Sequence, residues 1–381
     1  MDFYSELNKR FFLLMESEER SNKLRNPLIS DFEFGSLDDA LKELPPVKTM
    51  EEATPEEMKQ DLHREPIDPR QLRDTDKQDK TPLAAKTSRL IHSSTVKGIQ
   101  SEDGKEWDLD KLRNLLSTKP KEMLNQNDKM KHSGGGNSVF YNLSIPAYHG
   151  IYYNEADKQF ELVRTCPSAG ACKAFCYAAK GGYVQYPHSS IKTGQILNFL
   201  LNHPDEFKNN LVSEIKSKQK TLSKKGKKLV VRWHDTGDFF NGAYRKLAFE
   251  IAKETPDVKH YAYTKQVNEF RNLDDKPDNF TLNFSQGGTQ DKSIEKSDKQ
   301  ATVILKNMFK DLDLSNPKDI ETLKDRVAEK EDLDRDSIIS YDELMKKPEE
   351  DTPKYNVLVW AGHGDDAAVR KDVINTMLLI H

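Results

Sequence analysis

The order of apolar and polar residues predicts a chain in which short strands alternate with helices beyond about residue 133. Strand-like apolar segments occur at Val139–Ile145, Leu229–Trp233, His260–Thr264, Phe280–Phe284 and Val357–Ala361. Helical patterns separate several of them, at 189–201, 204–218 and 241–253. Strands that alternate with helices are typical of a parallel sheet, open or wound as a barrel. We therefore expect an α/β fold with a partial or irregular (β/α) barrel-like core.

The N-terminal third of the chain differs from this pattern. Residues 1–132 are rich in charged side chains, Gln and Pro, and we expect a polar, partly helical arm. Apolar residues at helical spacing within 1–26 predict a helix that docks on a partner or on the protein's own body. Short helices are predicted at Leu109–Leu116 and Pro120–Asn127. An unknown protein partner is expected to bind through this arm.

Three further segments complete the predicted organisation. Residues 133–290 form the α/β core, in which Ile151–Asn154 and Gln159–Val163 form a hairpin with a four-residue loop. Residues 291–354 form an acidic helical insertion, and 355–381 supply the final strand of the core and a helix over Ala367–Leu379.

Charge and hydropathy narrow the classes of function. There are 59 Lys and Arg residues against 63 Asp and Glu, for a formal net charge of −4, so bulk charge does not predict a nucleic-acid-binding protein. Seven lysines within 216–228 have no aromatic residue between them, and we do not expect nucleic acid there either. The apolar runs are too short to span a bilayer, and no signal peptide is visible. We expect a protein that is neither secreted nor inserted in a membrane.

The three cysteines of the chain, Cys166, Cys172 and Cys176, all lie within eleven residues. An odd number at this density favours a metal or redox site over a disulfide framework. Zinc would need a fourth ligand, which His188 or His149 can supply. A [4Fe–4S] cluster on three cysteines would instead leave one iron open for a small molecule. The plainest alternative is three thiols with no metal.

Polar residues follow three successive predicted strands. His234, Asp235 and Asp238 come after the strand that ends at Trp233, Lys265 ends the next strand, and 286–288 is a Gln-Gly-Gly turn after the third. Ligands of α/β proteins bind at the carboxyl ends of strands, so His234, Asp235, Asp238 and Lys265 are the candidate catalytic residues for a small-molecule substrate. Asp238 is equally suited to cap the helix that begins near Asn241.

Four segments of the core together resemble a known family. They are the cysteine loop 165–178 with Cys-Tyr-Ala at its last cysteine, the segment 136–146, the strand and Thr-Gly-Asp-Phe turn over 232–239, and Tyr-Ala-Tyr-Thr-Lys over 261–265. In their order along the chain, these segments resemble the phage family called gene product 88, and they are similar to phage radical-SAM-like proteins.

The resemblance implies a partial (β/α) barrel with the cluster at one mouth, and S-adenosylmethionine as a second cofactor. Phe175, which precedes the last cysteine, and Gly237 with Asp238 would then contact the cofactors. The cysteine spacing departs from the usual radical-SAM pattern, since five and three residues separate the ligands instead of three and two. A phage source would place the protein in the host cytoplasm or in the virion.

Two acidic segments are candidate sites for hard cations. Asp332, Asp334, Asp336, Ser340 and Glu343 fall at loop positions 1, 3, 5, 9 and 12 of a calcium-binding EF-hand, although Ser337 stands where Gly normally makes the turn. The alternative is an acidic loop between charged helices. His363, Asp365 and Asp366 after the last predicted strand can form a carboxylate-rich hydrolase site, or a turn that caps a helix.

Two functions remain open at this point. One is an iron–sulfur enzyme, radical-SAM-like in its sharpest form, that acts on a small molecule or a host component. The other is a non-catalytic protein in which zinc or a cluster only holds the loop together while residues 1–132 bind a partner. The sequence names neither the substrate nor the metal, the partner or the oligomeric state.

Overall fold

A computed structural model describes residues 54–69, 108–174, 176, 178, 187–271 and 273–379 of the chain. The helix predicted within 1–26 lies outside these residues, as does the part of the predicted arm between 70 and 107.

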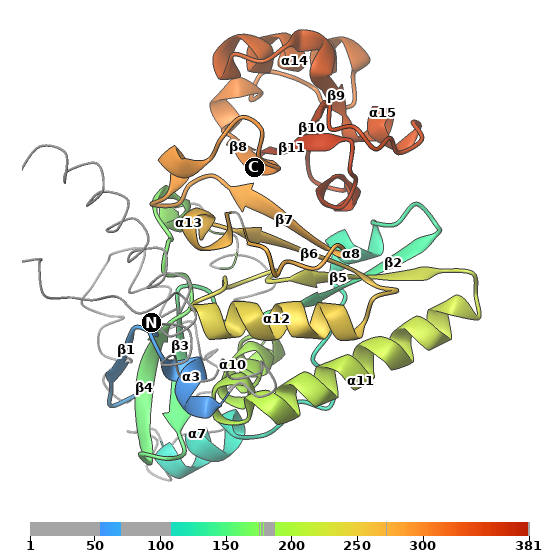
Figure 1. Ribbon diagram of the computed structural model, residues 1–381. Helices are drawn as coiled ribbons and strands as arrows, with labels where there is room; N and C mark the ends of the chain where they lie inside the picture. The colour runs from blue at the N-terminus through green and yellow to red at the C-terminus, as the bar shows by residue number, and fades with distance from the viewer. Residues whose placement is uncertain are drawn as a thin grey trace, which may run out of the picture. The chain divides into compact units, whose positions relative to one another are not determined.

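The centre of the structure is a sheet of eight parallel strands in the order β2-β5-β6-β7-β8-β11-β10-β9 (Figure 1). Its strands are β2 (Ser138–Leu143), β5 (Lys228–Trp233), β6 (Lys259–Thr264), β7 (Phe280–Ser285), β8 (Gln300–Ile304), β9 (Ile338–Ser340), β10 (Tyr355–Val359) and β11 (Val373–Leu379). The predicted α/β class is therefore confirmed. Closure into a barrel is not, because β2 and β9 are the two edge strands and do not pair with each other among the described residues.

A second, antiparallel sheet contains β1 (Arg64–Pro66), β4 (Gln159–Arg164) and β3 (His149–Asn154), in that order. The pairing of β3 with β4 begins at Asn154 opposite Gln159, so four residues form the turn of the predicted hairpin. Lys158 takes a positive φ of 54° in that turn. The cysteine loop starts directly after β4, which places it beside the carboxyl ends of the parallel strands.

Helix α10 (Pro187–Asn202) packs on β3 of the antiparallel sheet. Helices α11 (Pro204–Ser223) and α12 (Gly242–Glu254) cover one face of the parallel sheet, and Figure 1 shows them running alongside β5 and β6. Their apolar stripes pack on alternate strand residues such as Val231, Trp233 and Ala262, all of which are buried. This packing forms the largest apolar core of the described residues.

Parts of the segment predicted as an arm pack on the core. Met58 of α3 (Pro55–Lys59) and Leu112 of α7 (Leu109–Leu116) are completely buried. The helix predicted over Pro120–Asn127 is wrong, because Asn125 instead forms a β-bridge with Asn142 of β2. The only helical turn that follows it before β2 is α8 (Asp128–Lys131), which Asn127 caps through a hydrogen bond from the Met130 amide.

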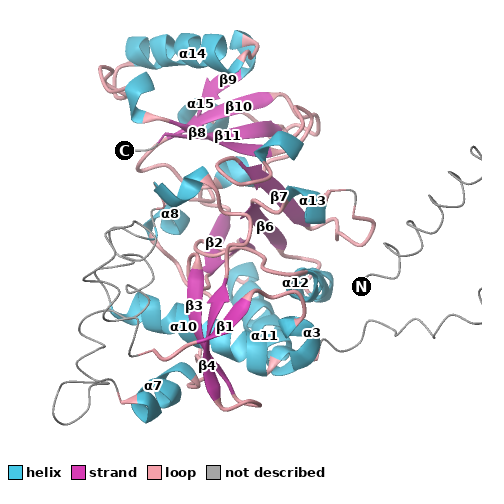
Figure 2. Cartoon of the chain, turned by 90° about the vertical axis from the view of Figure 1, so that its left-hand side faces the viewer, coloured by secondary structure: helices cyan, strands magenta, loops and turns pink. Residues whose placement is uncertain are grey.

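The insertion 291–354 is not only helical. It contains α14 (Pro317–Glu331) and α15 (Tyr341–Met345), but also β8 and β9, which are part of the parallel sheet (Figure 2). Short helix α13 (Val267–Phe270) precedes it, between β6 and β7. The two strands escaped prediction because both are short and lie among charged residues.

The helix predicted over Ala367–Leu379 is also wrong. A single 3₁₀ turn occupies Asp366–Ala368, and Val373–Leu379 forms β11 between β8 and β10. Most of this strand is buried, so its apolar residues do not alternate cleanly with polar ones. Such a run cannot be told from a buried helix by periodicity alone.

Candidate functional site

A cavity of about 520 Å³ lies at the carboxyl ends of the parallel strands. Its walls come from the segment before β2, the cysteine loop, the turn after β5, and the ends of β6, β7 and β11. The polar and sulfur-containing residues that line it are Asn127, Lys129, Tyr148, Cys166, Cys172, Cys176, Arg232, His234, Asp235, Thr236, Asp238, Tyr263, Lys265 and Ser285. The structure therefore brings all three cysteines and the four candidate catalytic residues to one cavity.

The cysteine loop is attached to the turn after β7 by its backbone. The amides of Gly170 and Cys172 both donate to the carbonyl oxygen of Gly287, at 3.2 and 2.9 Å. A Cβ atom on Gly170 would lie 2.8 Å from the Gly288 carbonyl, so the two chains approach too closely for a side chain there. This contact is the structural role of the Gln-Gly-Gly turn.

Tyr148 contacts all three cysteine residues, and sequence reasoning missed it. Its amide donates to Cys166 Sγ at 3.3 Å, and its hydroxyl lies 3.4 Å from the carbonyl oxygen of Cys172. Burial, followed by a hydrogen bond with the side chain of Cys176, strongly raises the pKa of this hydroxyl. Tyr148 also has a positive φ of 66°, an uncommon conformation for a bulky residue. No local motif marks Tyr148, which directly precedes β3.

The three cysteine thiols are candidate ligands for a metal or a cluster. Burial, followed by the nearby carboxylate of Asp238, raises the pKa of Cys166 to about 12. Burial also raises the pKa of Cys172, although the charge of Lys265 opposes this. Such thiols are protonated at neutral pH and become ligands when a cation replaces the proton. Soft sulfur donors of this kind are ligands of zinc and of iron–sulfur clusters.

The described residues do not form a preassembled site for a single metal ion. Across residues 54–69, 108–174, 176, 178, 187–271 and 273–379, no group of three or more His, Cys, Asp or Glu side chains is arranged to hold a metal ion. His149 lies in β3 and is not among the residues that line the cavity. His188 lies in α10 but its side chain is outside the described part, as is Phe175. Zinc with a histidine ligand therefore remains a prediction.

The turn after β5 is fixed by Gly237. This residue has a φ of 85°, and a Cβ atom on it would collide with the side chain of Ile145. The hydroxyl of Thr236 donates to the carbonyl oxygen of Ile145 at 2.7 Å, so the turn is held against the segment that follows β2. The strand-to-turn sequence thus requires glycine at 237 for a steric reason, and Gly237 lines the cavity.

Asp238 joins the ends of two neighbouring strands. Its carboxylate accepts hydrogen bonds from its neighbour Phe239, at 2.8 Å, and from the backbone amide of Lys265, at 2.9 Å. Burial raises the pKa of Asp238 to about 6, even though these amides favour the charged form. The alternative interpretation as a helix cap is wrong, because Asn241 accepts the hydrogen bond from Tyr244 at the start of α12.

His234 and Lys265 occupy the remaining strand ends. His234 is buried with a φ of 59°, and its Nε2 atom is 2.8 Å from the hydroxyl of Tyr244. Burial, followed by the charge of Arg232, lowers the pKa of His234 to about 3, so the ring is neutral. Its Nδ1 atom is buried with no hydrogen-bond partner among the described residues. Lys265 Nζ donates to Ser285 Oγ at 2.8 Å and to the Gln286 carbonyl at 3.0 Å.

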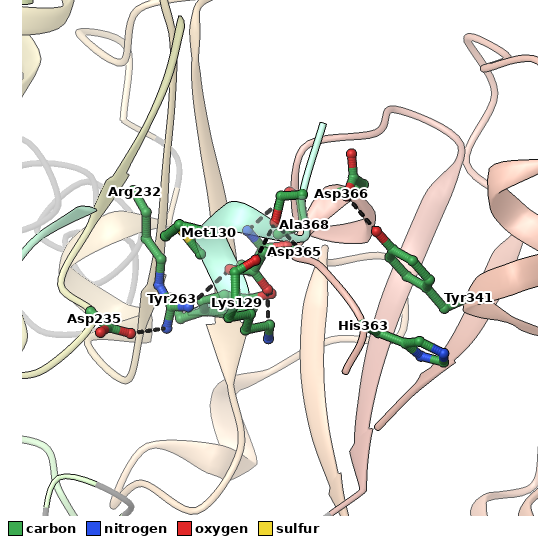
Figure 3. A network of polar contacts seen from close by, with 12 residues as sticks. Lys129, Met130, Arg232, Asp235, Tyr263, Tyr341, His363, Asp365, Asp366 and Ala368 are labelled. Carbon is green, nitrogen blue, oxygen red and sulfur yellow. Dashed lines mark hydrogen bonds and ion pairs between the residues drawn. The ribbon is translucent and has the colours of Figure 1, made fainter. Parts of the chain in front are cut away.

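A second polar network, centred on Asp365, supports the cavity wall (Figure 3). The Asp365 side chain is completely buried, and its carboxylate accepts four donors. They are Lys129 Nζ at 2.8 Å, Arg232 Nη1 at 2.9 Å, Tyr261 Oη at 2.7 Å and Tyr263 Oη at 2.9 Å. Burial alone would raise the pKa of Asp365, but Lys129 and Arg232 outweigh it and hold this pKa well below its usual range.

Asp235 belongs to the same network. One of its oxygens is 3.6 Å from Arg232 Nη2, and the other accepts from Asn127 Nδ2 at 2.7 Å. Sequence reasoning identified Asp235 but missed Asn127, Lys129 and Arg232. No local motif marks these three residues, because their partners lie more than 100 residues away along the chain, except for the Arg232–Asp235 pair.

The five residues of the predicted calcium loop do not converge on one point, and among the described residues Asp336 donates only its backbone amide, to Asp334 Oδ1. Ser340 and Glu343 form a capping box at the start of α15, and Glu343 also accepts from Lys324 Nζ at 2.9 Å. Asp334 caps a 3₁₀ turn at Arg335–Ser337, and Asp332 pairs with Lys296 at 3.3 Å. Without Gly at 337 the chain takes this turn and continues into β9. Calcium binding is not supported by this arrangement.

The three residues of the other acidic segment do not converge either. His363 stacks on Tyr341 with ring centroids 4.6 Å apart, while Asp366 accepts from the Tyr341 hydroxyl and from the Gly134 amide. Asp365 forms ion pairs with Lys129 and Arg232. These contacts hold the loop after β10 in place and leave no carboxylate pair for a hydrolase.

The comparisons with known proteins place the chain in one family. A family model described as gene product 88 matches residues 115–339, more than half of the chain. No curated protein and no solved structure matches significantly. Among the described helices, none is both long enough and apolar enough to cross a membrane. The matched region includes the cysteine loop, the turn after β5 and the ends of β6 and β7.

Proposed function

The chain belongs to the phage gene product 88 family, and we propose that it binds an iron–sulfur cluster and a small molecule side by side. Cys166, Cys172 and Cys176 would hold the cluster. The observation that carries the proposal is that every cysteine of the chain lines one cavity, together with charged residues from several strand ends.

The chain's own residues fit distinct tasks around these ligands. The Tyr148 amide points a hydrogen bond at Cys166 Sγ, and such bonds to ligand sulfurs tune cluster potentials. Lys265 lies close enough to Cys172 to lower its pKa, which favours the thiolate. Tyr148 and Lys265 would thus stabilise the deprotonated ligand set.

The turn after β5 would contact the small molecule. Asp238, with a pKa raised to about 6, can accept or release a proton near neutral pH. Neutral His234 offers one ring nitrogen to a hydrogen-bonding group of the ligand. Gly237 and Asp238 are also the residues that the radical-SAM resemblance assigns to S-adenosylmethionine, and binding of that cofactor is the sharper form of the proposal. A cluster with one open iron supplies single electrons to a molecule bound there.

The proposal is tested on full-length protein purified without oxygen. We expect iron and sulfide in the protein and broad absorption at about 400 nm, as thiolate-bound clusters show. Single Cys→Ser variants at 166, 172 and 176 should each lose most of the iron. Ser168→Ala is the matched control, since it changes a hydrogen bond to Gln266 in the same loop and leaves the three thiols.

The metal content and the cleavage assay decide between cluster binding and its alternatives. A colourless protein with one zinc would favour the non-catalytic alternative, in which the metal only stabilises the loop and residues 1–132 bind a protein partner. A metal-free protein would refute cluster binding. If the cluster forms but a strong reductant yields no cleavage of S-adenosylmethionine, the sharper form fails and cluster binding stands.

A further inference from the structure

Two positively charged side chains share one carboxylate on the cavity wall. Lys129 comes from α8 and Arg232 from β5, and both line the cavity. Figure 3 shows them converging on Asp365. Asp365 also accepts two tyrosine hydroxyls, so its two oxygens are occupied by four donors. Asp365 is therefore a scaffold that positions the two cations, and it has no lone pair left for a ligand.

Among the described residues Lys129 has fewer partners in this network than Arg232 has. One carboxylate serves two cations, and Asp235 approaches Arg232, not Lys129, at 3.6 Å. The Lys129 ammonium group has three N–H donors, and Asp365 Oδ1 is its one ion-pair partner among the described residues. The Lys129 side chain is 31% exposed, so the remaining donors can reach a bound molecule.

Arg232 is held more rigidly. Its side chain is 8% exposed, and its guanidinium group lies over the ring of Tyr263, 5.0 Å from the centroid. A buried cation on a cavity wall favours an anion in that cavity, because an anion compensates the loss of hydration.

We propose that Lys129, supported by Arg232, binds a carboxylate or phosphate group of the small molecule that occupies the cavity. This inference rests on the proposed function only for the presence of a small molecule, and it specifies that this molecule carries an anionic group. His234 lines the same cavity, and its Nδ1 atom is buried with no hydrogen-bond partner among the described residues.

The test measures binding of two simple anions, inorganic phosphate and succinate, by calorimetry with the full-length protein. At least one should bind the wild type, and Lys129→Met should weaken it about tenfold or more, the usual effect of losing a charge-assisted hydrogen bond. Lys129→Arg should keep most of the affinity. Lys131→Met is the matched control, because Lys131 is exposed on the same short helix and pairs only with Asp128.

The outcomes separate this inference from cluster binding. Each titration is run on metal-free protein and on protein reconstituted with iron and sulfide, and circular dichroism confirms that the variants are folded. Loss of anion binding in Lys129→Met with unchanged iron content supports the inference, and the preferred anion identifies the group. Absence of binding by the wild type, or equal binding by Lys129→Met, overturns it. Anion binding that depends on Lys129 in a protein without iron would uphold it while cluster binding fails.

Discussion

The two faces of the parallel sheet bury different kinds of side chain. On the face covered by α11 and α12, β5 and β6 contribute Val231, Trp233 and Ala262 to an apolar core. On the opposite face the same strands contribute Arg232 and Tyr263, which meet Asp365. Alternation along each strand makes this separation automatic, since neighbouring side chains point to opposite faces.

Two buried histidines show how hydrogen bonding differs between the helix-covered core and the cavity. His260 lies in the helix-covered core, where Nδ1 accepts from Trp233 at 3.2 Å and Nε2 is 2.9 Å from Thr255 Oγ1. His234 lies where the cavity begins, and only its Nε2 atom is bonded. A core satisfies its polar atoms for stability, whereas a binding cavity keeps some of them for a ligand. The predictions below test that contrast.

The largest expected effect comes from breaking the charged face. Asp365→Asn leaves Lys129 and Arg232 without their carboxylate, and removing one member of a buried ion pair typically costs about 3–5 kcal/mol. Denaturant unfolding of both proteins measures the change in the free energy of unfolding. Asp334→Asn, at an exposed position, is the control and should change it by less than about 1 kcal/mol. A loss below 1 kcal/mol in Asp365→Asn would show that this network is not a structural unit.

A smaller effect is expected at the turn that separates the two faces. Gly237→Ala adds a methyl group that collides with Ile145 and places alanine at a φ of 85°. The two costs together predict a loss of about 2–4 kcal/mol in the free energy of unfolding. Gly242→Ala is the matched control, because nothing lies within 4 Å of the added atom at the start of α12. If both variants unfold at the same denaturant concentration, the steric explanation for Gly237 is wrong.

The helix-covered core should impose a pH dependence. Burial lowers the pKa of His260 to about 3, against about 6.5 in the unfolded chain. The unfolded state therefore binds a proton first, and stability is lost as the pH falls from about 6.5 toward 3, by up to about 1.4 kcal/mol per pH unit for this residue. His234 acts in the same direction. Unfolding measured between pH 7.5 and 4.5 should show a shallower pH slope for His260→Gln.

The pH dependence has an internal control. At pH 7.5 neither state protonates this histidine appreciably, so any change in His260→Gln there reflects lost packing and hydrogen bonds. An unchanged slope between pH 6 and 4.5 would contradict a neutral, buried His260.

The smallest effect is expected at the loop from Asp332 to Glu343. Because Glu343 is held by the Ser340 cap and by Lys324, millimolar calcium should raise the melting temperature by less than about 1 °C, since a ligand stabilises only in proportion to its binding. Magnesium at the same concentration is the control. A calcium-specific increase of several degrees, abolished in Asp334→Asn, would restore the EF-hand interpretation.

Local patterns in the sequence predict much of this fold. The strands near Leu229–Trp233, His260–Thr264 and Phe280–Phe284, the hairpin, and helices α10 to α12 all follow from apolar periodicity. Apolar periodicity does not predict β11, because its residues are buried on both faces and lack the alternation that distinguishes a strand. It does not predict β8 and β9 either, because each strand is too short to show a period.

The candidate site likewise contains residues that the sequence predicts and residues that it does not. Cys166, Cys172 and Cys176 stand out by spacing, and His234, Asp238 and Lys265 by their positions after strands. Lys129 and Asp365 could not be paired from the sequence, because an ion pair between distant segments has no periodic signature. Tyr148 was missed because its contacts depend on a left-handed backbone conformation.

The ion pair between Lys129 and Asp365 also has a consequence for biosynthesis. The two residues are more than 200 positions apart in the sequence, and the amide of Asp365 donates to Ser133 Oγ beside them. The charged wall of the cavity therefore cannot assemble until the chain through Asp365 has left the ribosome. The cysteine loop emerges long before that point, so a nascent chain presents its three thiols to the solvent before the pocket around them is complete.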